Sequence, residues 1–170
     1  IWTDRPAAPG APFTPWPDEH AGESADAKRA RLAETLRGAG QKAAVITLPD
    51  SIAWLLNIRG ADVERNPVPH GFALLHDDGR VDLFARPGKA DAITGDGIAL
   101  HDWSAFPQAL ARLSGPVRID PKSAPEAVAR WIQDNNLLKS APFGVDRFGL
   151  YSSHQTSEGS RYRLEREYRL

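Results

Sequence analysis

One segment, residues 48–68, restricts the fold of this chain more than any other. Pro49 lies near its start, and proline suits the first turn of a helix because the backbone there needs no N–H donor. Apolar side chains follow at helical spacing as far as Leu56, and charged and amide side chains then take over. The segment therefore predicts a buried helix over 49–56 and a polar loop over 57–66 that leads into a strand.

The order of residue types in this segment resembles the aminopeptidase P (Xaa-Pro aminopeptidase) branch of the creatinase/prolidase family, peptidase family M24. In that branch a run reading D-x-I-A-W-L-x-N-x-R-G-x-D-V-x-x-N-P-V recurs. The matching positions here are Asp50, Ile52, Ala53, Trp54, Leu55, Asn57, Arg59, Gly60, Asp62, Val63, Asn66, Pro67 and Val68. The resemblance implies that the segment belongs to the middle, creatinase N-terminal-like domain, which does not carry the catalytic metals.

Helix and strand signals alternate along most of the chain. The expected elements are a helix over 25–37 with Ser24 as its N-cap, a strand over 42–47, the helix over 49–56, strands over 68–75 and 80–85 joined by an Asp-Gly turn, a strand over 97–101, a helix over 103–113, a strand over 117–120 and a helix over 124–134. Alternation of this kind, with one hairpin inside it, predicts an α/β fold with a mixed β-sheet flanked by helices. The resemblance implies the same class, the creatinase/prolidase N-terminal domain with its ribonuclease-H-like motif.

The chain divides into three parts on composition. Residues 1–22 carry repeated prolines among small residues, which predicts an extended interdomain linker. Trp2 and Trp16 within it could pin the linker to the domain surface, and a polyproline recognition motif is the alternative. Residues 23–136 are the creatinase/prolidase N-terminal-like domain. Residues 137–170 show no clear apolar period, so we interpret them as a C-terminal tail or linker of uncertain register.

Composition also excludes several classes of protein. The formal net charge of -1 argues against a nucleic-acid-binding protein, and no apolar run is long enough to cross a membrane. The sequence has no cysteine, which excludes disulfides and thiolate chemistry and fits a cytoplasmic location. The chain begins at Ile1 and contains no methionine, so we expect a piece of a longer protein.

The sequence offers no catalytic or metal-binding residues of its own. The resemblance implies a parent enzyme that removes the N-terminal residue preceding proline, with two Mn²⁺ ions held by a C-terminal pita-bread domain. No segment here matches the motifs for those ligands. The histidines also lack metal-binding spacing; they are His20, His70, His76, His101 and His154. We expect no cofactor in this chain, and no activity from the chain alone.

The polar loop is the one candidate for a functional site. Arg59 could pair with a carboxylate, Asp62 could accept a hydrogen bond from an amine or an arginine, and Asn66 sets the turn into the next strand. These side chains could tie the loop to itself, dock it against the catalytic domain, or contact substrate at the active-site entrance. All three interpretations remain open on the sequence.

The resemblance predicts a non-catalytic domain of a metal-dependent Xaa-Pro aminopeptidase that shapes the active-site entrance. Its partners would be the pita-bread domain of the same parent chain, proline-containing peptides for the parent, and a second copy in a homodimer. A stand-alone α/β binding module without peptidase activity is the alternative. A metal nuclease is a third possibility, suggested by the fold analogy and resting on Asp50, Asp82, Asp102 and Asp120. However, Asp82 alternates with apolar neighbours and is interpreted as the solvent face of a hairpin.

Overall fold

The computed structural model describes residues 4, 7–120, 123, 128, 147–156 and 159–169. The chain divides into two compact units, Ile1–Asn135 and Asn136–Leu170, which are described separately.

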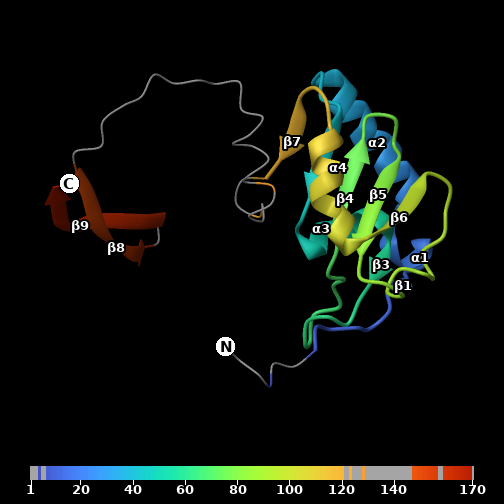
Figure 1. Cartoon of the computed structure of the whole chain (residues 1–170), viewed down its shortest axis with the longest axis horizontal. Coiled ribbons are helices and arrows are strands. Elements are labelled where there is room, and N and C mark those ends of the chain that lie inside the picture. The colour runs from blue at the N-terminus through green and yellow to red at the C-terminus, as the bar shows by residue number, and fades with distance from the viewer. Residues whose placement is uncertain are drawn as a thin grey trace. The chain divides into compact units, whose positions relative to one another are not determined.

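A mixed sheet of five strands forms the centre of the first unit (Figure 1). Its strands are β2 (Ala43–Ile46), β4 (Phe72–His76), β5 (Val81–Ala85), β6 (Ile98–Asp102) and β7 (Val117–Ile119). They lie in the order β6-β5-β4-β2-β7. Strand β4 runs antiparallel to both of its neighbours, whereas β6 and β7 are parallel to β5 and β2. The predicted fold class, a mixed sheet with helices, is confirmed.

Helices cover both faces of this sheet (Figure 1). They are α2 (Ala25–Gly38), α3 (Pro49–Leu56), the short 3₁₀ helix η1 (Trp103–Ala105) and α4 (Phe106–Arg112). Side chains alternate between the faces along each strand, so Ala73 and Leu75 join the core under α2 and α3. Leu74 lies between them and joins the core under α4. The central strands β4 and β5 are therefore buried on both sides, whereas the edge strand β6 is largely exposed.

Local signals explain where the helices begin and end. The Ser24 hydroxyl accepts a hydrogen bond from the backbone N–H of Ala27 at 3.1 Å, as expected of an N-cap. Pro49 and Pro107 each lie in the first turn of their helices. The strand predicted from residue 68 begins only at Phe72, because Pro69 has no N–H to give to a ladder.

The proline-rich segment packs on the domain from residue 13 onward. The side chain of Phe13 is fully buried, and its backbone N–H donates to the carbonyl of Lys89 at 2.7 Å. Strand β1 (Thr14–Pro15) pairs with β3 (Ile58–Arg59) in a separate two-stranded sheet, and helix α1 (Asp18–Ala21) follows. The segment therefore contributes a side chain to the core and a strand to a sheet, which its proline-rich composition did not indicate. Trp2 lies outside the described residues.

The second unit contains an antiparallel hairpin. Its strands are β8 (Arg147–Thr156) and β9 (Gly159–Arg169), in a region where the sequence predicted no strand. The helix predicted over 124–134 lies outside the described residues except for Val128, which is helical and buried against the core under α4.

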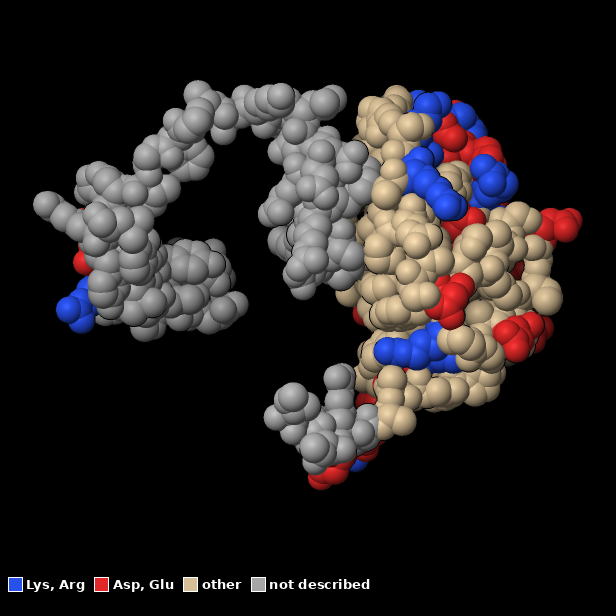
Figure 2. Space-filling view, in the orientation of Figure 1, with Lys and Arg blue, Asp and Glu red and all other residues tan. Residues whose placement is uncertain are grey.

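Acidic and basic side chains are interspersed on the described face of the first unit that Figure 2 shows, and they gather mainly over the end that carries α2. Within the described residues, no helix combines the length and apolar character needed to cross a membrane.

Candidate functional site

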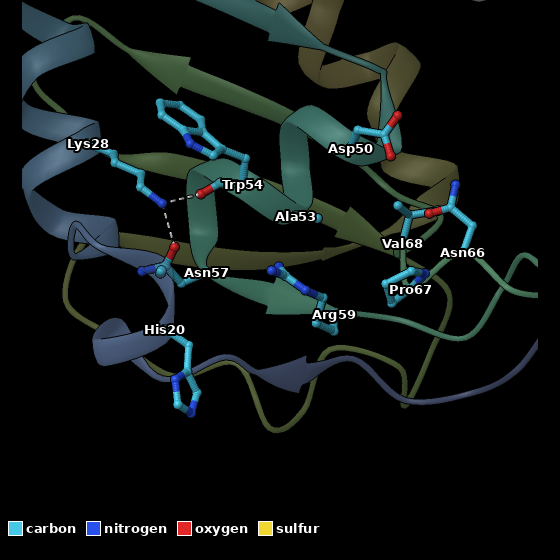
Figure 3. A pocket seen from close by; sticks show the side chains of 11 residues that line it. His20, Lys28, Asp50, Ala53, Trp54, Asn57, Arg59, Asn66, Pro67 and Val68 are labelled. Carbon is cyan, nitrogen blue, oxygen red and sulfur yellow. Dashed lines mark hydrogen bonds between the residues drawn. The ribbon is translucent and has the colours of Figure 1, made fainter.

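A pocket of about 330 Å³ opens where the end of α3 meets the polar loop (Figure 3). The residues that line it are His20, Ala21, Lys28, Asp50, Ala53, Trp54, Asn57, Arg59, Asn66, Pro67 and Val68. They come from α1, α2, α3, β3 and the loop after β3, so the pocket forms only when these five parts of the fold come together. Two of the three site residues predicted from the sequence, Arg59 and Asn66, lie here.

A buried ammonium group lies at one end of the pocket. Lys28 is 2% exposed, and its Nζ donates to the backbone oxygen of Trp54 at 2.9 Å and to Oδ1 of Asn57 at 2.6 Å. Burial lowers the pKa of Lys28 below its ordinary value, although the nearby carboxylates of Glu23 and Asp18 act in the opposite direction. The positive charge of Lys28 is therefore held by neutral acceptors.

Asn57 fixes the geometry at this end. It has a left-handed backbone (φ 47°, ψ 57°) that ends α3 and turns the chain into β3. Its Nδ2 donates to Oδ1 of Asp18 at 2.8 Å and to the backbone oxygen of Glu23 at 2.9 Å. With Lys28 bound to its oxygen, the side-chain amide has partners on both sides. Asn57 thus links three helices, α1, α2 and α3.

Arg59 lies in the middle of the pocket in the view of Figure 3. Its guanidinium carbon is 4.7 Å from the centre of the Trp16 ring, and Nη1 donates to the backbone oxygen of Ile58 at 2.9 Å. Among the described residues, Arg59 forms no ion pair with a carboxylate. The guanidinium is therefore held by an aromatic face while most of its N–H donors are left for other partners.

Asp50 and Asn66 lie at the other end of the pocket (Figure 3). Asp50 is in the first turn of α3, and its exposed side chain forms no ion pair or hydrogen bond with the residues that the structure describes. The backbone N–H of Asn66 donates to the carbonyl of Val63 at 3.1 Å, and its carbonyl accepts from the N–H of Val68 at 2.8 Å. The backbone of Asn66 thus closes the turn before the next strand.

Asp62, the third predicted residue, does not line the pocket. Its side chain is fully buried in an ion pair with Lys89, and its Oδ2 accepts a hydrogen bond from the backbone N–H of His70 at 2.6 Å. The Lys89 ammonium also donates to the carbonyl of Pro9 at 3.3 Å. Asp62 therefore anchors the loop from inside the domain, while Arg59 faces the pocket.

Gly60 allows the loop to fold closely onto the chain that follows it. A Cβ atom placed on Gly60 would lie 2.6 Å from Cα of Pro69 and 2.7 Å from the backbone oxygen of Val68. Both contacts are with backbone atoms, which cannot move aside as a flexible side chain can. The close approach brings Val68 to the wall of the pocket.

A second polar cluster lies on the sheet face under α4. Oδ2 and Oδ1 of Asp82 are 2.8 Å and 2.9 Å from Nε2 of His76 and Nε2 of His101. Burial raises the pKa of Asp82, but the hydrogen bonds and charges of the two imidazoles outweigh burial and hold the pKa below its ordinary value. The structure corrects the interpretation of Asp82 as a solvent-facing residue: it lines a cavity of about 230 Å³ with residues of α4.

This cluster does not fit a metal site. Each imidazole Nε2 is already taken by a different oxygen of Asp82, and no group of three histidine or acidic residues in the described part of the chain is arranged to hold a metal ion. The aspartates considered for a metal nuclease also lie in different parts of the domain. Asp50 lines the first pocket, and Asp102 caps η1 by accepting from the N–H of Ser104 at 2.8 Å.

Sequence reasoning missed the contributions of Lys28 and Trp16 to this site. Lys28 is not among the residues predicted from the sequence, although a lysine on the apolar stripe of a helix is a signal for a buried amine with acceptors nearby. Trp16 was correctly linked to the domain surface, but nothing local indicated that its ring would lie against Arg59.

Comparisons with known proteins agree on one domain type. The family model described as the Creatinase/Prolidase N-terminal domain matches residues 4–145. Aminopeptidase P1 of Arabidopsis thaliana is 41% identical over 78 residues, which are 46% of this chain and 12% of that protein. A probable Xaa-Pro aminopeptidase P of Ajellomyces capsulatus is 33% identical over 110 residues, which are 62% of this chain and 18% of that protein. The chain thus spans less than a fifth of the length of these relatives.

A solved structure is similar in fold and in sequence. It is the crystal structure of X-prolyl aminopeptidase from Caenorhabditis elegans, described as a cytosolic enzyme with a di-nuclear active site. The TM-score is 0.61 at 28% sequence identity, and the match covers 65% of this chain and 19% of that chain.

Proposed function

The chain belongs to the creatinase/prolidase N-terminal domain family, and we propose that it is the non-catalytic middle domain of an Xaa-Pro aminopeptidase. The observation that carries the proposal is the family match over residues 4–145, together with relatives named for this activity of which the chain spans only 11% to 19%. The parent would release the N-terminal residue that precedes proline. Its two metal ions, Mn²⁺ in this proposal, would be held by a pita-bread domain outside this chain, and the parent would act in the cytoplasm as a homodimer.

In this proposal the domain shapes the entrance to the active site through the pocket around Arg59 and Asn66. Three features support a rigid, preorganised surface. Strand β3 is paired with β1, the Arg59 guanidinium lies on Trp16, and Asp62 anchors the loop by its buried ion pair. A surface that is already ordered loses little conformational freedom when it docks. The proposed partner is the pita-bread domain of the same parent chain, with proline-containing peptides passing between the two.

The test compares this chain with the proposed parent, the longer aminopeptidase that would include the pita-bread domain. We expect the purified chain to release no N-terminal residue from an Xaa-Pro-Yaa peptide, with or without Mn²⁺, and the parent to do so only with the metal. In the parent, Arg59→Gln should raise KM for the peptide more than it lowers kcat, because Arg59 lies at the entrance and not among the reacting groups. Turnover by this chain alone would refute the proposal.

A stand-alone α/β binding module is the second candidate. The observation in its favour is that the pocket is formed by residues of this chain alone. Reading the gene downstream distinguishes the two. An open frame with two aspartates, a histidine and two glutamates as metal ligands supports the aminopeptidase, whereas an early stop supports the module.

A further inference from the structure

We infer that a second pocket, at the edge of the five-stranded sheet, binds a small amphiphilic carboxylate, with its acid group at Arg118 and its short apolar body against Trp54 and Leu55. This edge pocket has a volume of about 330 Å³, and its lining includes Leu32, Leu48, Trp54, Leu55 and Arg118. Of these residues only Trp54 also lines the pocket around Arg59. The inference goes beyond the proposed function, because neither a peptide nor a catalytic domain takes part in it.

The edge pocket forms where one face of β7 is left uncovered. Strand β7 is the outermost strand of the sheet, beside β2 (Figure 1). Among the residues that the structure describes, Val117 and Ile119 pack against the core under α4, but no side chain of β7 joins the core under α2 and α3. Arg118 is paired with Ala44, which packs on that second core, so Arg118 lies on the same side of the sheet. This side of the edge therefore combines an apolar surface with a guanidinium.

The guanidinium of Arg118 has donors left for an anion. Its Nε donates to Oε1 of Gln41 at 2.8 Å, and it forms no ion pair with a carboxylate in the described part of the chain. Asp120, a carboxylate of the same lining, accepts a hydrogen bond from the Ser123 hydroxyl at 2.9 Å. A guanidinium can bind a carboxylate through two parallel hydrogen bonds, so Arg118 favours an acid over a neutral ligand.

The apolar wall of the edge pocket is held in place by contacts from outside it. Trp54 is 46% exposed, yet Nζ of Lys28 and the guanidinium carbon of Arg31 lie 4.8 Å and 5.8 Å from its ring centre. The Thr47 hydroxyl donates to the backbone oxygen of Ser123 at 2.7 Å, which joins the end of β2 to the chain that follows β7. A wall that is already ordered loses little conformational freedom when a ligand binds.

The size and the lining of the edge pocket indicate the class of ligand. Its volume is near the lower limit of small-molecule sites, which are about 300–1,000 Å³. Leucine, isoleucine and tryptophan side chains make up most of its apolar lining. A purely apolar ligand would give the guanidinium no partner, and a small anion would leave the apolar lining in contact with water. An acid on a short aliphatic or aromatic body matches both parts of the pocket.

The experiment is a titration of the full chain, labelled with ¹⁵N, with octanoate, 1-octanol and butyrate. Octanol has the same chain without the charge, and butyrate has the same charge on a shorter chain. We expect octanoate to cause saturable shifts of the backbone amides over 44–48 and 117–119. It should bind about tenfold tighter than either comparison probe, because octanol lacks the charge-assisted contact and butyrate lacks most of the apolar one. No saturable shift at these amides, or equally tight binding of either comparison probe, would overturn the inference.

A variant of Arg118 tests the place of the acid group. Arg118→Gln should bind octanoate and octanol equally. The matched control is Arg86→Gln, which removes a guanidinium that lies 4.8 Å from the Trp103 ring centre, outside the edge pocket. This control should keep the preference for octanoate. A preference that survives in Arg118→Gln, or is lost in Arg86→Gln, would refute the assignment.

Two leucines of equal exposure test the place of the apolar body. Leu48 and Leu100 are both 42% exposed, but Leu48 lines the edge pocket whereas Leu100 lies on β6, away from it. Leu48→Ala should weaken the binding of octanoate and octanol alike, by about threefold, and Leu100→Ala should change neither. Equal effects of the two variants would refute the assignment. None of these measurements depends on peptidase activity, so failure here is distinct from failure of the proposed function.

Discussion

Nζ of Lys28 lies 2.6 Å from Oδ1 of Asn57, and this single contact joins α2 to the residue that ends α3. We predict that Lys28→Met destabilises the first unit by about 1–3 kcal/mol, because the backbone oxygen of Trp54 and the amide of Asn57 lose a buried donor. Urea unfolding followed by tryptophan fluorescence measures the loss.

The matched control is Lys42→Met. Lys42 pairs with Asp77 at 3.0 Å, but its side chain is 63% exposed, so the change should cost about 0–1 kcal/mol. Equal losses for the two variants would show that the Lys28 contacts do not hold the helices together.

The buried pair of Asp62 and Lys89 leads to a second prediction. Lys89→Met should destabilise the fold by about 3–5 kcal/mol, because the Asp62 carboxylate is left fully buried without its charge partner. Adding Asp62→Asn to this variant should recover part of the loss, since the unpaired charge is then removed. Thermal unfolding of the single and double variants tests both statements, and strictly additive losses would contradict them.

Gly60 and Gly38 should respond to alanine with opposite signs. Gly60→Ala should destabilise by about 1–3 kcal/mol, because the new Cβ meets the backbone of Pro69 and Val68. Gly38→Ala should stabilise by about 0.5–1 kcal/mol, because Gly38 ends α2 with nothing within 4 Å of the new atom. The urea concentrations at the unfolding midpoints of the two variants, compared with that of the unchanged chain, give the sign of each stability change. Two losses of similar size would count against the close approach at Gly60.

The Asp82 cluster predicts how stability changes with pH. The folded-state pKa of Asp82 is held below its ordinary value, so its stabilising contribution is present above the unfolded pKa, about 3.9, and is lost as pH falls through the folded value. The difference in unfolding free energy between the unchanged chain and Asp82→Asn should therefore shrink as the pH falls below about 4. Urea unfolding across this range measures it, and the exposed Asp91→Asn variant serves as the control. A difference that does not change with pH would contradict the prediction.

The elements that could be predicted from the sequence have local causes. The bounds of α3 follow from Pro49 and from the change to polar residues after Leu56, and the hairpin of β4 and β5 follows from the Asp-Gly turn. Each cause lies within a few residues of its effect. The mixed sheet followed from the order of such elements.

The burial of charged side chains could not be predicted in this way. Arg29 is 5% exposed because its guanidinium donates to the carbonyls of Gly79 and Asp96, far along the chain. The cluster around Asp82 depends on strand register, which places Asp82 opposite Leu74 and Ala99. His76 and His101 lie two residues further along those strands, on the same face. Register is a tertiary property, so spacing in the sequence does not reveal it.

The candidate site was predicted in part. Arg59 and Asn66 line the pocket, whereas Asp62 turns inward because its partner Lys89 comes from a loop that follows β5. Strands β8 and β9 were not predicted, although Tyr162, Leu164 and Tyr168 lie at even spacing among charged residues, a pattern typical of a strand.

The anchoring of the proline-rich segment has a consequence for how this domain can be exchanged between proteins. The composition of residues 1–22 is typical of a linker, so a recombination point after residue 22 would be expected to leave the domain fold unchanged. It would nevertheless remove Phe13 from the core and Trp16 from beneath Arg59. The domain therefore begins within the proline-rich segment. A copy transferred to another protein from the start of α2 onward would lack part of the pocket around Arg59.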